Sequence, residues 1–452
     1  MKKMKHDVPT RLVKVLILIL MMVAFGFVWY GYYAARAQVH YYRRGDWVVI
    51  LLFGILYYGF CRSYDAFHIS ISPISEIIYS QTLALIISDF IMYVVIWLLS
   101  LYMPNAVPLL ITFGVQFLIS VLWTFLAHQW YFHNFRPGRT AVIYDLREGM
   151  ESLVGEYGME KKFHIEKVLG VEECLAKLSV LDEMDTVFLS GIHSHERNII
   201  LKYCMYQDIQ VYVIPRIGDV IMGGAKKVHM FHLPMLRIDR YRPIPEYTIA
   251  KRAFDILFSG IAIVIASPFM LVTAIAIKSD GGPALYKQKR LTKDGKEFNV
   301  LKFRSMRVDA EKDGVARLST GDKDDRITPV GKIIRKIRFD ELPQLFNILR
   351  GDMSIVGPRP ERPEIARQYE EEMPEFRLRL QAKAGLTGYA QVYGKYNTTP
   401  YDKLLMDLTY IGTPSLWEDF KICLATVKIL FMPESTEGVA EGATTAMGGE
   451  KH

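Results

Sequence analysis

The sequence predicts a membrane α + α/β protein with three folded parts in a row, and three observations lead to this fold class. Long apolar runs fill the first third of the chain, where most of them are long enough to span a bilayer. Short apolar segments then alternate with helical patterns, which is typical of a small parallel α/β domain. A later apolar run precedes a charged, soluble-looking segment, which predicts a mixed α/β domain attached to a membrane helix.

The composition agrees with a membrane protein that also has large soluble parts. The chain has 452 residues, of which 51% are hydrophobic and 23% are charged, and this length predicts two or three domains. The formal net charge of +7 is mild. It fits a cytoplasmic membrane face or anionic substrates better than a dedicated nucleic-acid binder. The 4 cysteines are scattered without C-x-x-C spacing, so they predict neither a zinc site nor a disulfide framework.

Four apolar runs predict a four-helix transmembrane region over residues 1–134, and these runs are 15–35, 47–61, 83–103 and 107–126. Tryptophan and tyrosine at the ends of the runs resemble the aromatic belts of membrane interfaces. Lysine and arginine are more frequent on the side that holds the N-terminus than on the opposite side. We therefore expect the N-terminus and everything after the fourth run to lie in the cytoplasm.

Asp89 lies inside the third of these runs. An acidic residue within a membrane span is a functional candidate by default, because placing a charge in lipid is costly. We favour a structural interpretation, in which the carboxyl group hydrogen-bonds a serine or tyrosine side chain inside the helix bundle.

Residues 135–245 predict a small Rossmann-like α/β domain. Expected strands lie at 141–144, 186–189 and 211–214, with helices at 171–180 and 196–208 between them. The turn after the first strand lacks the G-x-G-x-x-G pattern that lets a pyrophosphate approach the backbone, so a degenerate structural or regulatory domain is favoured over dinucleotide binding. His193, His195 and Glu196 could ligate a metal, but a loop leading into a helix N-terminus is the favoured interpretation.

Residues 251–278 form a basic-flanked apolar stretch that is long enough to span a bilayer. Ser267 and Pro268 interrupt it half-way, and proline removes a backbone donor and kinks a helix. A crossing helix would place the charged, phosphate-friendly segment behind it outside the cell. We therefore expect a re-entrant helix that enters one leaflet and returns to the cytoplasmic side, with the freed backbone groups satisfied within the protein.

Asp340 and Glu341 are adjacent carboxylates in a basic surround. We expect Asp340 to cap a helix that continues through the apolar residues behind it and ends at Gly351. A helix N-terminus favours phosphate. Two carboxylates repel phosphate unless a cation intervenes, and oxygen ligands suit Mg²⁺, so the pair predicts a nucleophilic or Mg²⁺-binding site that serves a phosphate. An ordinary capped helix with a solvated acidic start is the alternative.

Several further motifs flank this pair in a fixed order. Pro-Arg-Pro at 358–360 locks the local backbone and presents Arg359, whose guanidinium can grip phosphate. The others are Gln-x-Arg at 288–290, Lys-Phe-Arg-Ser-Met at 302–306, Asp-Arg-Ile-Thr at 325–328, Gly-Leu-Thr-Gly at 385–388 and Asp-Leu-Thr-Tyr at 407–410.

Together these motifs resemble the bacterial sugar transferase family, the monotopic phosphoglycosyl transferases that start exopolysaccharide, capsule and O-antigen synthesis. The resemblance covers about 247–431, and it implies a sugar phosphotransferase catalytic domain over 246–432. It implies a re-entrant helix broken at Ser267-Pro268 in a bacterial inner or plasma membrane, with the catalytic domain on the cytoplasmic face. The four-span region and the α/β domain resemble the large members, which transfer a hexose phosphate. By that analogy we favour galactose or glucose over an N-acetylated sugar.

The resemblance also implies a reaction. Asp340 would attack the β-phosphorus of a UDP-sugar and release UMP, and undecaprenyl phosphate would then accept the phosphosugar. Glu341, with Asp340, would hold Mg²⁺. Arg335 and Arg359 stand where family members place phosphate-binding arginines, and Lys302 and Arg304 are weaker candidates.

The sequence departs from the family pattern at two places and leaves some alternatives open. Arg338-Phe339 replaces the common Ser-Leu, and Leu291-Thr292 replaces the common Val-Gly. Neither change removes a charge that the mechanism needs. The alternatives are a catalytically inactive assembly or regulatory protein and a Mg²⁺-dependent nucleotide-sugar hydrolase. A homodimer is one open option, and residues 433–452 are expected to be disordered.

Overall fold

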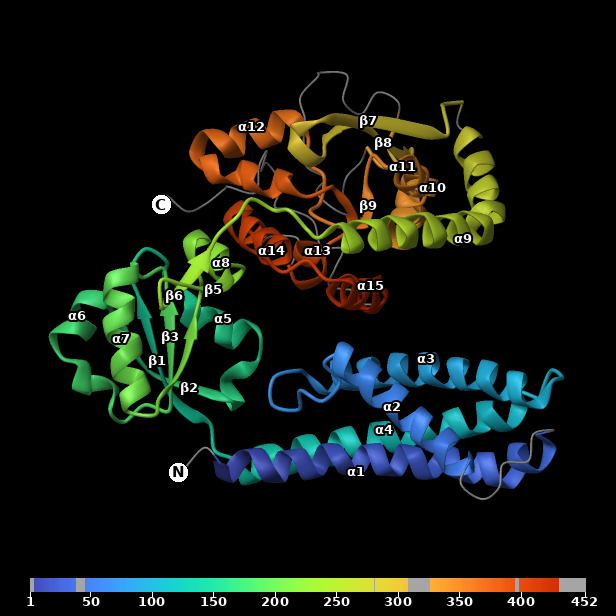
Figure 1. Cartoon of the computed structure of the whole chain (residues 1–452), viewed down its shortest axis with the longest axis horizontal. Helices are drawn as coiled ribbons and strands as arrows, with labels where there is room; N and C mark the ends of the chain where they lie inside the picture. The colour runs from blue at the N-terminus through green and yellow to red at the C-terminus, as the bar shows by residue number, and fades with distance from the viewer. Residues whose placement is uncertain (1–3, 38–44, 280, 308–325, 395–397, 431–452) are drawn as a thin grey trace. The chain divides into compact units, whose positions relative to one another are not determined.

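The computed structural model describes residues 4–37, 45–279, 281–307, 326–394 and 398–430 (Figure 1). The chain divides into two compact units, Met1–Ile214 and Pro215–His452. The tail at 433–452, which we expect to be disordered, lies outside the described residues. The predicted boundaries near 134, 245 and 432 stay predictions.

The first unit begins with four long apolar helices. They are α1 (Met4–Val28), α2 (Gly45–Ser63), α3 (Ile74–Ser100) and α4 (Val107–Asn134). Each belongs to a segment long and apolar enough to cross a membrane, and α9 in the second unit is a fifth such helix. The helices pack through aromatic stacking, as between Phe25 and Phe53, whose ring centroids lie 4.5 Å apart. Many other apolar side chains are exposed, which suits contact with lipid.

Asp89 on α3 does not behave as the sequence predicts. Its side chain is buried, yet neither carboxyl oxygen has a hydrogen-bond partner among the residues that the structure describes. The expected serine or tyrosine partner is therefore wrong. Between α3 and α4, the Ser120 hydroxyl donates a hydrogen bond to Oε1 of Gln81 over 2.5 Å.

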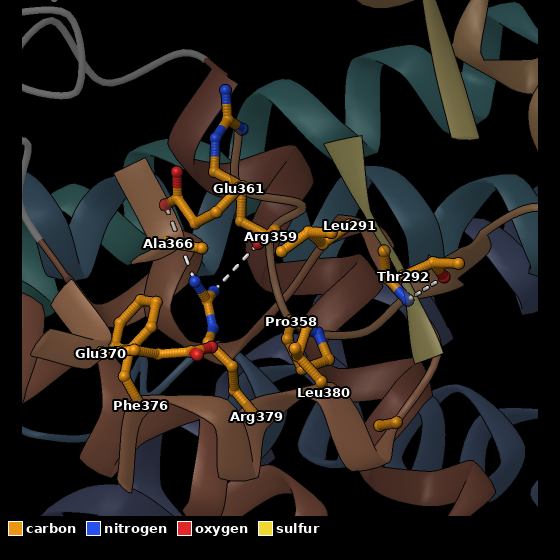
Figure 2. A pocket seen from close by; sticks show the side chains of 12 residues that line it. Leu291, Thr292, Pro358, Arg359, Glu361, Ala366, Glu370, Phe376, Arg379 and Leu380 are labelled. Carbon is orange, nitrogen blue, oxygen red and sulfur yellow. Dashed lines mark hydrogen bonds and ion pairs between the residues drawn. The ribbon is translucent and has the colours of Figure 1, made fainter. Parts of the chain in front are cut away.

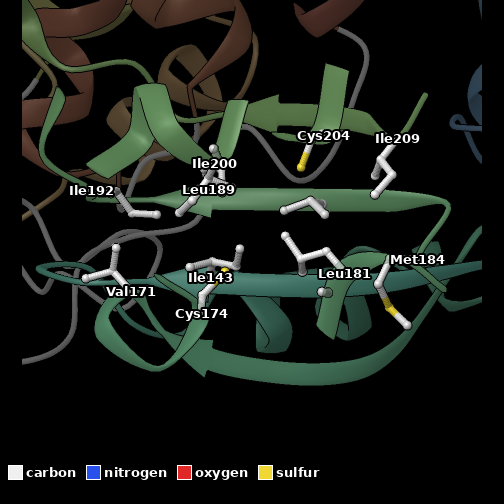
Figure 3. Close-up of a cluster of buried hydrophobic side chains, with 12 residues drawn as sticks. Ile143, Val171, Cys174, Leu181, Met184, Leu189, Ile192, Ile200, Cys204 and Ile209 are labelled. Carbon is white, nitrogen blue, oxygen red and sulfur yellow. The ribbon is translucent and has the colours of Figure 1, made fainter. Parts of the chain in front are cut away.

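A parallel sheet in the order β2-β1-β3-β4 completes the first unit and confirms the α/β prediction. Its strands are β1 (Gly138–Tyr144), β2 (Phe163–Gly170), β3 (Thr186–Ser190) and β4 (Gln210–Val213). Helices α5 (Met150–Glu156), α6 (Val171–Ala176) and α7 (Ser194–Tyr206) connect them. Figure 3 shows part of the core, in which Ile143, Leu189 and Ile200 are fully buried. Strand β2 was missed because its apolar residues alternate with charged ones.

The metal alternative for the β3–α7 loop finds no support. His193 is the N-cap of α7, and its Nε2 lies 3.9 Å from a carboxyl oxygen of Asp145 with both side chains partly exposed. Across the described ranges, no group of three or more His, Cys, Asp and Glu residues could hold a metal ion. The interpretation as a loop leading into a helix is confirmed.

The second unit contains small sheets surrounded by helices. The sheets are two antiparallel hairpins, β5 (Lys226–Met230) with β6 (Leu233–Arg237) and β7 (Leu285–Leu291) with β8 (Glu297–Phe303), and one parallel pair, β9 (Ser354–Val356) with β10 (Gly385–Thr387). The helices are α8 (Ile217–Gly223), α9 (Pro245–Lys278), α10 (Pro329–Lys336), α11 (Gln344–Arg350), α12 (Pro363–Glu372), α13 (Tyr389–Tyr393), α14 (Pro400–Gly412) and α15 (Leu416–Leu430).

Helix α9 changes direction sharply part-way along, as Figure 1 shows, and it contains Pro268. Both of its limbs pack on the same body. Ala262 and Ile263 lie against a cluster that includes Ile348, whereas Ile277, farther along the helix, packs with Phe303. A straight helix would carry its far end away from that body, so the bend lets one helix frame two sides of the same core.

Helix α15 has one buried side and one exposed apolar side. Ile422 is fully buried in the core of the second unit. Trp417 and Phe420 on the same helix are exposed, at 54% and 42% of their surface. One side of α15 therefore packs into the core while another presents large apolar side chains.

Candidate active site

Asp340 and Glu341 lie in a 3-10 turn, Phe339–Glu341, between α10 and α11. The expected capping by Asp340 is wrong, because α11 begins at Gln344 and its N-cap is Pro343. The predicted end of the helix at Gly351 is confirmed, and this glycine has a left-handed backbone with φ 92°. The two carboxylates therefore owe their environment to neighbouring side chains and not to a helix N-terminus.

Arg338 redirects the chain immediately before the acidic pair. Its φ of 59° places it in the left-handed region, where a residue other than glycine costs on the order of 1–3 kcal/mol. This turn separates the end of α10 from the 3-10 turn. Backbone strain of this kind is held by surrounding structure and gathers at functional sites.

Glu341 is clamped by two cations. Lys302 Nζ on β8 donates a hydrogen bond to Oε1 over 2.8 Å, and Arg359 Nη2 donates to the same oxygen over 3.1 Å. The Glu341 side chain is only 14% exposed. Burial raises the pKa of Glu341, but Lys302 and Arg359 outweigh burial and hold the pKa well below its usual range. The Glu341 carboxylate therefore holds both cations at a single oxygen.

Asp340 has a different environment from its neighbour. It is half-buried, and its carboxylate makes no hydrogen bond or ion pair with any residue that the structure describes. Burial, and secondly the charge of Glu341, raise the pKa of Asp340, while Lys302 and Arg335 oppose the rise. A carboxylate that is not engaged by a cation keeps its electron pairs available, which suits a nucleophile.

Arg335 lies in the last turn of α10. Its Nη1 atom is buried, and this nitrogen has no hydrogen-bond partner within the described part of the chain. A buried guanidinium N–H without a partner is costly unless a ligand completes it. Because the charge of Arg335 also acts on Asp340, this donor is suited to an anionic group bound beside that carboxylate.

Arg304 does not join this group. Its guanidinium donates to the backbone oxygens of Ile277 over 3.0 Å and Pro283 over 2.9 Å, at the end of α9 and in the loop behind it. The residue is 7% exposed. A Cβ added to Gly282 would lie 2.5 Å from its Cζ atom, so the loop is shaped around the arginine. These contacts indicate a structural role and give no support to phosphate binding by Arg304.

The part of α9 around Ser267 and Pro268 reaches the acidic turn. Ser267 Oγ donates to the backbone oxygen of Val264 over 2.8 Å, which occupies the hydroxyl within the helix. The next aromatic residue, Phe269, meets Phe339 edge-on with ring centroids 6.5 Å apart. Phe339 directly precedes Asp340, so one ring contact joins the interrupted part of the helix to the candidate nucleophile. The sequence analysis missed this contact, which pairs residues far apart in the chain.

A pocket is lined in part by the loop that carries Arg359 (Figure 2). Glu361 and Arg379 contribute side chains to its lining, and neither was a sequence candidate. Arg379 Nη2 donates to the backbone oxygen of Arg359 over 2.9 Å. Asp407 holds Arg379 in turn, and its place in the Asp-Leu-Thr-Tyr motif was the available signal for this buried network.

The acidic pair offers oxygen donors that fit Mg²⁺ only in part. Asp340 has both carboxyl oxygens uncommitted among the described residues, and Glu341 commits Oε1 to its two cations. Protein Mg²⁺ sites commonly use one or two carboxylates together with substrate phosphates and water. The donor set is therefore chemically compatible with an ion that binds together with a phosphorylated substrate.

The comparisons with known proteins concern this half of the chain. A protein-family model described as bacterial sugar transferase matches residues 246–433. The chain is 41% identical over 201 residues to a UDP-glucose:undecaprenyl-phosphate glucose-1-phosphate transferase from Caulobacter vibrioides, which covers 43% of this chain and 74% of the relative.

Other relatives align over a smaller share of their length. A UDP-N-acetylgalactosamine-undecaprenyl-phosphate N-acetylgalactosaminephosphotransferase from Aeromonas hydrophila is 39% identical, over 51% of this chain and 54% of the relative. An undecaprenyl-phosphate galactose phosphotransferase from Salmonella typhimurium is 38% identical, over 49% of each protein. The chain thus spans about half the length of these two relatives.

Proposed function

Because the chain belongs to the bacterial sugar transferase family, we propose that it transfers a sugar 1-phosphate from a UDP-sugar to undecaprenyl phosphate. The relatives are named for this type of reaction. The observation that carries the proposal is the contrast between two adjacent carboxylates. Glu341 is held by two cations, whereas Asp340 is half-buried and unengaged within the described residues.

The reaction proceeds in two displacements. An oxygen of Asp340 attacks the β-phosphorus of the UDP-sugar, and the bond from that phosphorus to the bridging oxygen breaks, so that UMP leaves. An oxygen of undecaprenyl phosphate then attacks the same phosphorus. The bond to Asp340 breaks, which restores the carboxylate and yields undecaprenyl diphosphate sugar. The covalent aspartyl intermediate is the central claim that requires testing.

The cations around the acidic pair give this chemistry its electrostatics. Arg359 is 42% exposed while it contacts Glu341, so its guanidinium is accessible to a diphosphate. Arg335 and Lys302 add positive charge beside Asp340, which offsets the repulsion between a carboxylate and a phosphate. Glu341 and Asp340 would hold Mg²⁺, which neutralises diphosphate charge when it is bound.

The membrane arrangement is part of the proposal. We propose that α9 is re-entrant and that α1–α4 span the bilayer, with the second unit on the cytoplasmic face. Several observations support re-entry: the bend of α9, the packing of both limbs on one body, and large exposed apolar residues such as Val264 and Val272. This arrangement would bring a lipid phosphate to the depth of Asp340.

The sugar remains to be identified among the hexoses. We propose glucose or galactose, which the names of two relatives contain. Another relative is named for N-acetylgalactosamine, so UDP-N-acetylgalactosamine must be tested together with UDP-glucose and UDP-galactose.

The decisive experiment measures UMP release by the purified full-length chain from UDP-glucose, UDP-galactose and UDP-N-acetylgalactosamine, with and without undecaprenyl phosphate. We expect lipid-dependent release from one sugar, which is abolished by Asp340→Asn and by EDTA. Unchanged release in Asp340→Asn would exclude this residue as the nucleophile. Repeated turnover without lipid would indicate a hydrolase, and no release with any sugar would indicate an assembly protein.

A further inference from the structure

Two arginines, the buried Arg379 and the partly buried Arg290, hold the backbone of the loop that carries Arg359. Arg379 Nη2 donates to the backbone oxygen of Arg359 over 2.9 Å, and Arg290 Nη1 donates to the backbone oxygen of Pro360 over 3.0 Å. The prolines at 358 and 360 have no N–H, so this loop cannot anchor itself through those two amides. Backbone N–H groups bind the carbonyl groups of Pro358 and Glu361, and the two carbonyl groups between them are held by the arginine side chains.

Arg379 is itself rigidly oriented. Its Nε atom donates to Oδ2 of Asp407 over 2.9 Å, and its Nη2 atom lies 2.7 Å from the same oxygen. The two side chains are 4% and 2% exposed. Its guanidinium also lies 4.8 Å from the ring centroid of Phe376. A planar guanidinium with several fixed partners loses little further freedom when it holds a carbonyl group, so Arg379 is a stiff support.

Arg290 is fixed in a similar way from the other side. Its Nε and Nη2 atoms donate to Oε1 of Gln288 over 3.2 and 2.7 Å. Glu361 stands between the two arginines, with Oε1 3.7 Å from Arg379 Nη1 and Oε2 3.8 Å from Arg290 Nη1. Figure 2 shows Glu361 and the backbone of Arg359 on either side of the Arg379 guanidinium. The Glu361 carboxylate at the end of the loop therefore forms ion pairs with both Arg379 and Arg290.

We infer that Arg379, together with Arg290, is a positioning residue that sets the direction of Arg359. The inference rests on the proposed function, in which Arg359 binds the substrate diphosphate. The two arginines are balanced by Glu361 and Asp407, so the cluster as a whole adds little net charge to the site. Its effect on the reaction is thus geometric, and a small displacement of a binding group can cost a large factor in rate.

A double-mutant cycle tests this inference through the kcat/KM of UMP release. Arg379→Lys keeps the charge, but one ammonium cannot reproduce the planar contacts to Asp407 and to the Arg359 carbonyl. We expect about a tenfold loss in the wild-type background and less than about a twofold further loss in Arg359→Ala, because the supported side chain is then absent. Arg377→Lys is the matched control, since Arg377 is exposed on the same turn, Pro374–Gln381.

Hydrogen exchange gives a second readout that does not require activity. In Arg379→Lys, the amides of residues 354–357, 359, 361 and 362 should exchange faster than in Arg377→Lys, measured well below the unfolding midpoint of both variants. Equal loss of kcat/KM in both backgrounds, or unchanged exchange in this segment, would overturn the inference. A wild-type chain that releases no UMP would instead defeat the proposed function, and hydrogen exchange would still decide whether Arg379 holds the loop.

Discussion

Lys302 Nζ lies 2.8 Å from Oε1 of Glu341, and this ion pair joins β8 to the turn that holds Asp340. The two side chains are 20% and 14% exposed, so both charges are largely withdrawn from water. Removing one partner of such a pair is strongly destabilising, because it leaves the other charge buried without compensation. The same ion pair therefore stabilises the turn Phe339–Glu341 and keeps the positive charge of Lys302 close to Asp340.

Lys302→Met should lower both the stability and the activity of the protein. We expect a loss of about 3–5 kcal/mol in the free energy of unfolding, the usual cost of breaking a buried pair. UMP release should fall as well, because Asp340 loses a neighbouring cation. Thermal unfolding in detergent and UMP release measure the two effects. The double variant Lys302→Met/Glu341→Gln should regain part of the stability but not the activity, and a double variant no more stable than Lys302→Met would contradict this account.

The rate of the first displacement should fall as the pH is lowered. We expect this fall to begin at a pH above the usual pKa of an aspartate. Asp340 attacks only when it is deprotonated, and burial followed by the charge of Glu341 raises its pKa. Arg335 opposes that rise, so Arg335→Met should move the acid limb to still higher pH. Single-turnover UMP release measured against pH gives the limb. Lys332→Met is the control, because Lys332 is exposed on the same helix, and an unmoved limb in Arg335→Met would refute the assignment.

The pH dependence of stability should have the opposite sign for the two carboxylates. The pKa of Glu341 is lower in the folded state than in the unfolded chain, so its contribution is present above the unfolded pKa and is lost as the pH falls through the folded pKa. The pKa of Asp340 is raised, so its contribution is present below the unfolded pKa and is lost as the pH rises through the folded pKa. Asp340→Asn should therefore unfold at a higher temperature, relative to wild type, at pH 7 than at pH 4.

Sequence patterns predicted the parts of the fold that depend on local composition. Apolar length gave α1–α4 and α9, and the alternation of strands and helices gave the parallel sheet. Strand β2, which was not expected from the sequence, lies at an edge of that sheet. Its apolar residues alternate with charged ones, and only one of its faces is well covered. Pro268 signalled an interruption in α9, and the structure bends this helix without ending it.

The candidate site was predictable as a set of residues but not as a geometry. The adjacency of Asp340 and Glu341 is visible in the sequence, whereas their division into an unengaged and a clamped carboxylate depends on Lys302 and Arg359 arriving from other elements. The capping prediction failed because the left-handed Arg338 begins a separate turn. Arg379 went unnoticed because its partners are a distant carboxylate and a backbone carbonyl.

If α9 is re-entrant, as we propose, both ends of the helix should be reached from the same side of the membrane. Ile249→Cys and Ser279→Cys place exposed thiols near its two ends, in a background in which the native cysteines are replaced. In right-side-out and inverted vesicles, an impermeant maleimide should label both positions from the cytoplasmic side only. Labelling from opposite sides would establish a crossing helix and exclude re-entry. A cysteine in the predicted cytoplasmic N-terminal segment provides the orientation control.

Arg304→Met should lower the stability of the protein but leave the binding of the UDP-sugar nearly unchanged. Lys302→Met, in contrast, should lower both stability and activity. Arg304 is buried and donates to the backbone oxygens of Ile277 and Pro283, so its loss leaves two carbonyl groups without these donors. We expect a loss of about 2–4 kcal/mol in the free energy of unfolding, because unsatisfied buried polar groups cost about 1–3 kcal/mol each. The KM for the UDP-sugar, measured on folded protein well below the unfolding midpoint, should change less than about twofold, since a group that contacts no substrate does not contribute to binding it. A large rise in KM with unchanged stability would instead assign Arg304 to the phosphate site, as the motif first suggested.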